Sequence, residues 1–473
     1  MASPENKPTP PFHMVAMPYP GRGHINPMLN FCKAVAERRS DILITFVVTE
    51  EWLGLIGSTT KPPNISFASV PNVVPSERVR GDDAHGFALA VLAKMGEPFE
   101  RLLDERWLAP SPDLIVADAL LPWAAEAAAI RNIPMAYLWC MSASVYAMFD
   151  HFDLLVHNGH FPVDLSVNGD AVVDYIPGLS PIRLSDLPHI LRDPETSSLL
   201  LKVFPSDSKS KYLIFDSISE LESQVLKHLK QKSKFSIFNI GPADSYIKSK
   251  HFITSTSNTD DGNATDDEYY LNWLDQQPLD SVLYISLGSF LYVSGAQMDE
   301  IANGLQRSGV RFLWVALRET ARLQEMCGKK GLVVDWCDQL RVLCHPSVGG
   351  FWSHCGWNSM KEAALAGVPM LTSPILMDQL PNAKVIVEDW RIGWRVSESE
   401  FGEENLVKGD EIKEIVGRFM ELESLERGEL VRNAIELKKV CEREFEVGGS
   451  FDVNLDGFVE SILQRRSSTV RDT

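Results

Sequence analysis

The sequence has few cysteines, no long apolar run and no excess of positive charge. Its 473 residues include 7 Cys, an odd number with no Cys-x-x-Cys pair, which disfavours a disulfide framework and favours a reducing compartment. No stretch reaches the roughly 18 apolar residues of a membrane span. Residues 1–11 are polar and rich in proline, without the apolar segment of a signal peptide. We therefore expect a cytoplasmic protein.

Acidic residues outnumber basic ones by 64 to 45, which gives a formal net charge of −19. Such a field repels nucleic acid and anionic membranes, so we expect neither as a partner. An anionic ligand would have to be held by local dipoles. The composition, 45% hydrophobic and 23% charged, is typical of a globular protein. The length predicts two domains, and we expect a monomer.

No metal site follows from the cysteines and histidines of the second half of the chain. Their spacing fits none of the standard zinc sites, so we expect no metal. The residues considered are Cys337, Cys344, His345, His354 and Cys355.

Strand and helix patterns alternate along the chain, which predicts an α/β fold with two Rossmann-like, doubly wound parallel sheets. Apolar strands are expected at 12–17, 42–49, 114–119, 135–139, 282–287, 312–317, 332–335, 348–352 and 368–372. Residues 245–267 are rich in Ser, Thr, Asn, Asp and Gly, so they predict a linker. The expected domains are residues 1–244 and 268–450, with residues 451–473 forming a C-terminal helix that packs back on the first domain.

The turn from His354 to Ser359 lies where a parallel strand gives way to a helix expected at 359–366. Unpaired N–H groups and the positive end of a helix dipole would suit a diphosphate there. Between His345 and Met360 there is no Lys or Arg, which favours binding by dipoles. A plain helix cap is the alternative, since Ser359 and Glu362 match a capping box.

The run from Trp336 to Gln379 closely resembles the signature box of plant secondary-product glycosyltransferases, the family 1 UDP-dependent enzymes of GT-B fold. The matching positions are Trp336, Gln339, His345, His354 to Ser359, Glu362, Gly367 to Pro369, Asp378 and Gln379. The resemblance extends over most of the chain. It implies two Rossmann-like domains facing a cleft, with UDP-glucose held mainly by the second and the acceptor mainly by the first.

The resemblance also implies a role for each donor-site residue. Trp336 would stack on the uracil, with Cys337 and Gln339 near the base edge, and Glu362 would hold the ribose. The diphosphate would be contacted by Ser289, His354, Asn358 and Ser359. The sugar would be bound by Trp357, Asp378 and Gln379. Gln at the last box position accompanies glucose donors in this family, so Gln379 points to glucose.

His24 and Asp118 are the candidate catalytic pair. His24 is expected in a loop, before a helix with Asn26 as N-cap and Pro27 as its first residue. Asp118 ends a later strand, so both residues belong to the carboxyl edge of one sheet, where ligands bind. A histidine is a suitable general base near neutral pH. The family resemblance implies that His24 is the base and that Asp118 stabilises its imidazolium; the alternatives are a helix-capping His and a turn Asp.

One position departs from the family pattern. The run after Pro134 has Trp139 and Cys140 where the family commonly has Trp and Thr, so a thiol replaces a hydroxyl expected to touch the donor; Ser142 is the nearest possible replacement. The acceptor is not specified. Side chains near the catalytic strands that could line an apolar pocket, or equally belong to the core, are Leu120, Leu121, Met141, Phe149 and Phe152.

The expected function is that of an inverting UDP-glucose-dependent O-glucosyltransferase acting on a small, largely apolar hydroxylated acceptor. No Asp-x-Asp motif is present, so no metal cofactor is expected. One alternative is an NAD(P)-dependent oxidoreductase, because Gly21 and Gly23 follow a strand, although Asn26 stands where the third glycine of that fingerprint belongs. The other is a non-catalytic nucleotide-sugar binder on the same fold.

Overall fold

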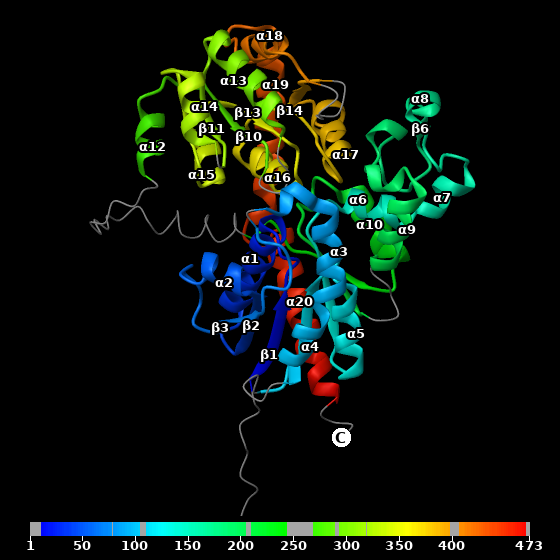
Figure 1. Cartoon of the computed structure of the whole chain (residues 1–473). Coiled ribbons are helices and arrows are strands. Elements are labelled where there is room, and N and C mark those ends of the chain that lie inside the picture. The colour runs from blue at the N-terminus through cyan, green and yellow to red at the C-terminus, as the bar shows by residue number, and fades with distance from the viewer. Residues whose placement is uncertain are drawn as a thin grey trace, which may run out of the picture.

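Two parallel sheets with helices around them form the molecule (Figure 1). The computed structural model describes residues 11–77, 79–104, 110–204, 210–243, 268–288, 293–317, 319–397 and 406–469. The predicted α/β class with two doubly wound sheets is confirmed. The predicted linker at 245–267 lies outside the described residues. No helix in the described ranges is both long enough and apolar enough to cross a bilayer.

The first sheet has the strand order β3-β2-β1-β4-β5-β8-β9, and every neighbouring pair is parallel. Its strands are β1 (Phe12–Met17), β2 (Ile42–Thr49), β3 (Ile65–Val70), β4 (Leu114–Asp118), β5 (Met135–Trp139), β8 (Tyr212–Phe215) and β9 (Ser236–Asn239). A separate antiparallel pair joins β6 (Val172–Val173) to β7 (Ile182–Arg183).

The second sheet has the order β12-β11-β10-β13-β14-β15 and is also parallel throughout. Its strands are β10 (Val282–Ser286), β11 (Arg311–Val315), β12 (Gly331–Val334), β13 (Val348–Ser353), β14 (Met370–Thr372) and β15 (Gly393–Arg395).

Helices cover both faces of each sheet, which is why the central strands are apolar at almost every position. In the first half these are α1 (Arg22–Arg38), α2 (Glu50–Ile56), α3 (Ala84–Lys94), α4 (Gly96–Asp104), α5 (Pro122–Ile130), α6 (Ala143–Asp150), α7 (Phe152–His157), α8 (Leu165–Asn168), α9 (Pro194–Val203) and α10 (Ser223–Lys232). In the second half they are α12 (Glu268–Asp275), α13 (Gly295–Ser308), α14 (Thr320–Cys327), α15 (Gln339–Leu343), α16 (Trp357–Ala366), α17 (Gln379–Lys384), α18 (Gly409–Phe419), α19 (Leu425–Glu442) and α20 (Ser450–Thr469).

The last helix, α20, runs alongside the first sheet rather than the second (Figure 1). The Phe458 ring packs edge-on against Phe31 of α1 and Phe238 of β9, with centroids 5.6 and 5.5 Å apart. Arg38 of α1 forms ion pairs with Asp452 and Asp456 of α20. The C-terminal helix thus completes the hydrophobic core of the N-terminal half.

Strand register brings the functional loops together. In the first sheet β1 pairs with β4, with Met17 opposite Ala117, so the segments that follow these strands are neighbours. In the second sheet β10 pairs with β13, with Ser286 opposite Ser353. Because the carboxyl ends of parallel strands share one edge, each sheet presents a pair of loops at its ligand-binding side.

Candidate active site

His24 lies in the first turn of α1 rather than in a loop. The helix begins at Arg22 with Gly21 as its N-cap, so the expectation that Asn26 caps it and Pro27 starts it is wrong. Pro27 lies inside this helix. A proline is tolerated there when another donor takes the place of its missing N–H. Because α1 begins at Arg22, the His24 side chain is held by a helix rather than by a loop.

The imidazole of His24 is bonded to a buried carboxylate. His24 Nδ1 lies 2.7 Å from Asp118 Oδ2, and the other carboxylate oxygen accepts the backbone N–H of Leu120 at 3.0 Å. The side chain of Asp118 is 2% exposed and that of His24 is 23% exposed. Since an ionised carboxylate only accepts, Nδ1 carries the proton, and the neutral ring keeps its lone pair on Nε2. That is the tautomer a general base requires.

The thiol of Cys140 lies beside this pair. Its Sγ donates to Asp118 Oδ2 over 3.7 Å. Burial, and then the charges of Asp118 and Asp216, raise the pKa of the Cys140 thiol well above its usual range, so it stays protonated. Ser142 does not replace the missing hydroxyl, because its side chain is buried and accepts the Val145 N–H as the N-cap of α6.

Asn358 joins the donor side of the cleft to the helix that carries His24. Its Nδ2 donates to the carbonyl of Gly23 over 3.0 Å. The residue four positions after Gly23 is Pro27, which has no N–H to give to that carbonyl. The proline therefore leaves a helical acceptor available, and a side chain from the other sheet uses it.

A second junction between the halves lies around Asp216, at the end of β8. The indole N–H of Trp357 and the ammonium of Lys361 both donate to the Asp216 carbonyl, at 2.9 and 2.8 Å, and Lys361 also pairs with its carboxylate. Trp357 and Lys361 are buried. The indole N–H of Trp357, a residue that the family resemblance places at the sugar, is thus bonded to the first half of the chain.

The turn before α16 has the features of an anion site. The N-cap is Gly356, which contributes no side-chain cap, so the capping-box interpretation of Ser359 and Glu362 is wrong: the helix starts at Trp357 and Ser359 lies inside it. The N–H groups of Asn358 and Ser359 belong to the first turn, where no preceding carbonyl can bond them. The predicted diphosphate residue Ser289 lies outside the described residues.

His354 is a neutral polar group enclosed at this turn. Burial lowers the pKa of His354 to about 4, against the opposing effect of the Ser286 backbone. Its Nδ1 is buried and has no hydrogen-bond partner among the described residues. A Cβ at Gly288 or Gly356 would come within 3.0 and 2.6 Å of the ring, respectively, so both positions require glycine. The glycines face the Nε2 side of the ring, and the unsatisfied buried Nδ1 fits a polar group of a ligand.

Three polar side chains of the box form one network. Gln339 Nε2 donates to Ser359 Oγ at 3.0 Å and to Glu362 Oε2 at 2.7 Å, and its Oε1 accepts from the Tyr284 hydroxyl at 3.2 Å. The same hydroxyl lies 3.4 Å from Sγ of buried Cys337. Gln339 therefore positions Glu362, and Cys337 contacts the network through the Tyr284 hydroxyl.

Trp336 remains accessible beside this network. It is 46% exposed, although most tryptophans in the chain are buried. An exposed indole face is suited to stacking on a planar base.

Asp378 is the N-cap of α17, and Gln379 is the first residue of that helix. Asp378 Oδ2 accepts from Asn382 at 2.9 Å. Burial raises the pKa of Asp378 to about 6, while the charge of His24 acts to lower it. Gln379 Oε1 accepts the backbone N–H groups of Ile375 and Leu376 at 2.8 and 3.1 Å, so the side chain holds its own loop and has only Nε2 to offer a ligand.

The five candidate acceptor-pocket residues divide into two groups. Leu121 and Phe149 belong to the buried core, which is the alternative that the sequence left open for them, and Phe149 packs on Trp139. Met141 is also largely buried. Leu120 and Phe152 are partly exposed against the same core.

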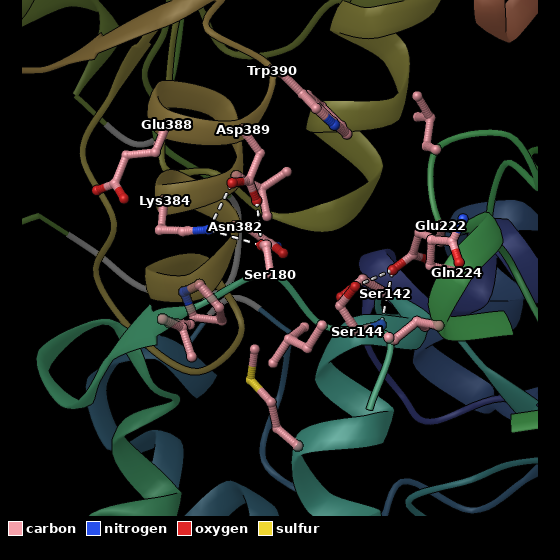
Figure 2. Close-up of a pocket in the computed structure, with 18 of the residues that line it drawn as sticks. Ser142, Ser144, Ser180, Glu222, Gln224, Asn382, Lys384, Glu388, Asp389 and Trp390 are labelled. Atoms are coloured by element: carbon pink, nitrogen blue, oxygen red, sulfur yellow. Dashed lines mark hydrogen bonds and ion pairs between the residues drawn. The ribbon is translucent and has the colours of Figure 1, made fainter. Parts of the chain in front are cut away.

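A cavity of about 750 Å³ lies between the two halves, but its lining includes neither His24 nor Asp118. Figure 2 shows Lys384 between Ser180 and Asp389, with 2.8 and 2.7 Å bonds, and Glu222 bonded to Ser144. Lys384 and Glu222, two of the charged residues that line the cavity, are thus bonded to neighbouring side chains.

The cysteine and histidine residues weighed as a zinc cluster do not converge. His345 bonds to Ser347 and Asp275, and Cys344 is exposed. Within the described ranges the chain brings three metal-ligating side chains together at one place, which is formed by His24, Asp118 and Cys140.

Two parallel sheets, a His–Asp pair at the edge of one and a helix start without a side-chain cap at the edge of the other are the arrangement of the GT-B class of glycosyltransferases. Structural neighbours agree. The chain superposes on Medicago truncatula UGT71G1 complexed with UDP-glucose with a TM-score of 0.78 and 23% identity, covering 96% of this chain and 98% of that one. For Os79 from O. sativa in complex with UDP, the TM-score is 0.77 and the identity 26%, over 95% and 100% of the two chains.

Sequence comparisons identify the family. The family model described as UDP-glucoronosyl and UDP-glucosyl transferase matches residues 263–416. UDP-glycosyltransferases 87A1 and 87A2 of Arabidopsis thaliana are 47% and 46% identical to the chain, each over 95% of it and over 100% and 96% of their own lengths. The protein belongs to the UDP-glycosyltransferase family, and it is a glycosyltransferase enzyme, as the resemblance predicted.

Proposed function

We propose that the enzyme transfers glucose from UDP-glucose to a hydroxyl of a small, largely apolar acceptor, with inversion at the anomeric carbon. The observation that carries this proposal is the pairing of His24, whose Nδ1 is tied to a buried carboxylate while the ring itself is partly exposed. A binder that only held a nucleotide sugar would not need an oriented base.

In the proposed reaction the acceptor hydroxyl gives its proton to His24 Nε2 as its oxygen attacks C1 of glucose. The C1–O bond to UDP breaks on the opposite face, which gives a β-glucoside. Asp118 holds the ring and stabilises the imidazolium that forms. No metal cofactor takes part in this proposal.

The second sheet would hold the leaving diphosphate. The first-turn N–H groups of α16 and the side chains of His354, Asn358 and Ser359 are suited to this, because fixed dipoles stabilise developing charge without reorganising. Neutral His354 would act as a hydrogen-bond donor rather than a cation. Asn358 is bonded to Gly23, the residue that precedes His24. This contact supports a position for the diphosphate close to the base.

The remaining box residues would recognise the rest of the donor. Trp336 would stack on the uracil, the network of Gln339 would hold Glu362 towards the ribose, and Asp378 with Gln379 Nε2 would read the sugar hydroxyls. Glucose is proposed from Gln379 and is in keeping with the UDP-glucose complex of the Medicago truncatula neighbour. Os79 has been solved with U2F and trichothecene, an acceptor class in keeping with an apolar hydroxylated molecule.

The test is His24→Ala combined with an acceptor screen. Wild type should release UDP and add one hexose mass to phenolic, flavonoid or terpenoid alcohols when given UDP-glucose. His24→Ala should lose transfer by at least about a hundredfold while UDP affinity stays within about twofold. Near-normal turnover of the variant would reject His24 as the base. Bound NAD(P) or a flavin spectrum in the purified protein would favour an oxidoreductase instead.

A further inference from the structure

Three side chains with metal-ligating atoms meet directly behind the catalytic base. They come from the first turn of α1, the end of β4 and the position after β5, namely His24, Asp118 and Cys140. One imidazole nitrogen, one carboxylate oxygen and the thiol sulfur all lie within 4.8 Å of one another. The Asp118 oxygen is the shared point, 2.7 Å from His24 Nδ1 and 3.7 Å from Cys140 Sγ.

We propose that these residues form an inhibitory site for a borderline-soft divalent cation, with Zn²⁺ as the best fit. Nitrogen, sulfur and carboxylate oxygen are the ligand types of zinc, and bonds of about 2.0–2.3 Å in tetrahedral geometry place the ligand atoms roughly 3.4–3.6 Å apart. The Sγ–Oδ2 separation of 3.7 Å already matches this value. The Nδ1–Oδ2 separation of 2.7 Å must widen by less than about 1 Å, within reach of a rotation of the His24 side chain.

The local charges favour a cation at this point. Asp118 and Asp216 both act on the thiol, and Lys361, which also acts on it, is engaged by Asp216. The two carboxylates make the field at the thiol sulfur negative, which favours a divalent cation there. The partly exposed His24 side chain provides the entry route.

Binding exchanges one proton for one cation. Bonds form from zinc to Nδ1, to a carboxylate oxygen and to the thiolate, and the hydrogen bond between His24 and Asp118 breaks. The Nδ1 proton passes to the solvent while Nε2 takes one up, and the thiol proton is also released, so one proton leaves in all. A water molecule takes the fourth position, as in other zinc sites with three protein ligands. No electron is transferred.

The consequence for catalysis follows from the tautomer of His24. With zinc on Nδ1, the proton of the neutral ring must lie on Nε2, so Nε2 has no lone pair for the acceptor proton. The cleft stays open, but the base is lost. This inhibition rests on the proposed role of His24, whereas metal binding itself does not.

Cys140 is the residue on which the site depends, because the Thr that the family commonly has at this position carries a neutral hydroxyl, which is a poor zinc ligand. Cys140→Thr therefore removes the sulfur ligand and restores the usual family residue. Cys140→Ser is a second, smaller replacement. Cys344→Ser is a matched control, because Cys344 is the exposed free cysteine of the described residues.

The experiment measures metal binding and inhibition separately. Co²⁺ is titrated into metal-free wild type and into each variant, and a thiolate-to-cobalt charge-transfer band is recorded. Zn²⁺ inhibition is then measured relative to the metal-free rate of the same protein, with reversal by EDTA. We expect the band in wild type and Cys344→Ser and not in Cys140→Thr or Cys140→Ser, and we expect Cys140→Thr to need at least about tenfold more zinc for half inhibition.

A band that persists in both Cys140 variants, or that disappears in Cys344→Ser, would overturn the proposed site. Equal zinc inhibition of wild type and Cys140→Thr would overturn its effect on the base. Because the absorption band needs no turnover, it still tests the site if the proposed transferase reaction fails with every acceptor.

Discussion

Replacing Asp118 with Asn tests whether the buried carboxylate prepares His24 for catalysis. Asn keeps the size of the side chain and an oxygen for the Leu120 N–H, so the strand end should hold its shape. The charge that faces the imidazolium over 2.7 Å is removed. The amide can also donate to Nδ1, which forces the ring proton onto Nε2 and leaves no base.

The size of the effect follows from these two losses. A hydrogen bond to a charged group contributes about 1.5–3 kcal/mol, or roughly 10- to 100-fold in rate. The wrong tautomer adds to this, and the same substitution in a Ser-His-Asp triad costs about 10⁴-fold in kcat. We therefore expect kcat of Asp118→Asn to fall by about 10²- to 10⁴-fold. UDP affinity should change by less than about twofold, because the candidate donor contacts belong to the other sheet.

The assay is initial-rate UDP release at saturating donor and acceptor, with UDP affinity measured by calorimetry. The double variant His24→Ala/Asp118→Asn should be no slower than His24→Ala, because residues that act as one unit are not additive. A kcat within about threefold of wild type would refute the reasoning. Weakened UDP binding with unchanged kcat would instead assign Asp118 a structural role.

Three further predictions concern other contacts. Pro27→Ala supplies a helical N–H to the Gly23 carbonyl, which accepts from Asn358 in the wild type. The variant should lose about threefold to tenfold in kcat/KM without a fall in Tm. An unchanged kcat/KM would show that the contact between Asn358 and Gly23 does not contribute to catalysis. Asp378, with its pKa raised to about 6, loses its charge as the pH falls through that value, so the donor KM should rise below about pH 6 in wild type but stay flat in Asp378→Asn. Burial and Glu220 raise the pKa of Glu444, so the folded chain keeps a proton that the unfolded chain loses. The folded state is therefore destabilised as the pH rises above the pKa of this group in the unfolded chain. Glu444→Gln should gain Tm relative to wild type between about pH 5 and pH 8, and parallel Tm curves of the two proteins would contradict this.

The sequence predicted the fold where strands are apolar on both faces. The bounds of β1, β2 and β5 match their expected ranges, because strands of a parallel sheet that are buried on both faces form nearly continuous apolar runs. β3 was not predicted: it lies at the sheet edge, and buried residues alternate there with Ser66 and other less buried positions. β15 has three residues, Gly393–Arg395, too few for any periodicity to be visible.

The candidate site could be predicted as a set of residues but not as a set of contacts. Parallel topology places His24 and Asp118 at one edge, and their bond follows from that. Nothing local indicates that the Trp357 indole turns to Asp216, because this contact joins residues 141 positions apart. The neighbours of Cys140 depend in the same way on how the strands are ordered.

The position of α20 has a consequence for how the chain is made. Phe451, Leu455 and Phe458 lie in the same buried cluster as Met14 and Phe31, yet more than 400 residues separate them in synthesis. At about 5–20 residues per second, the ribosome needs roughly 10–40 seconds to pass from the end of the first sheet to this helix. During that interval the apolar residues of β1 and α1 in this cluster lack the cover of α20, so we expect a stop codon before residue 450 to destabilise the half that was synthesised first.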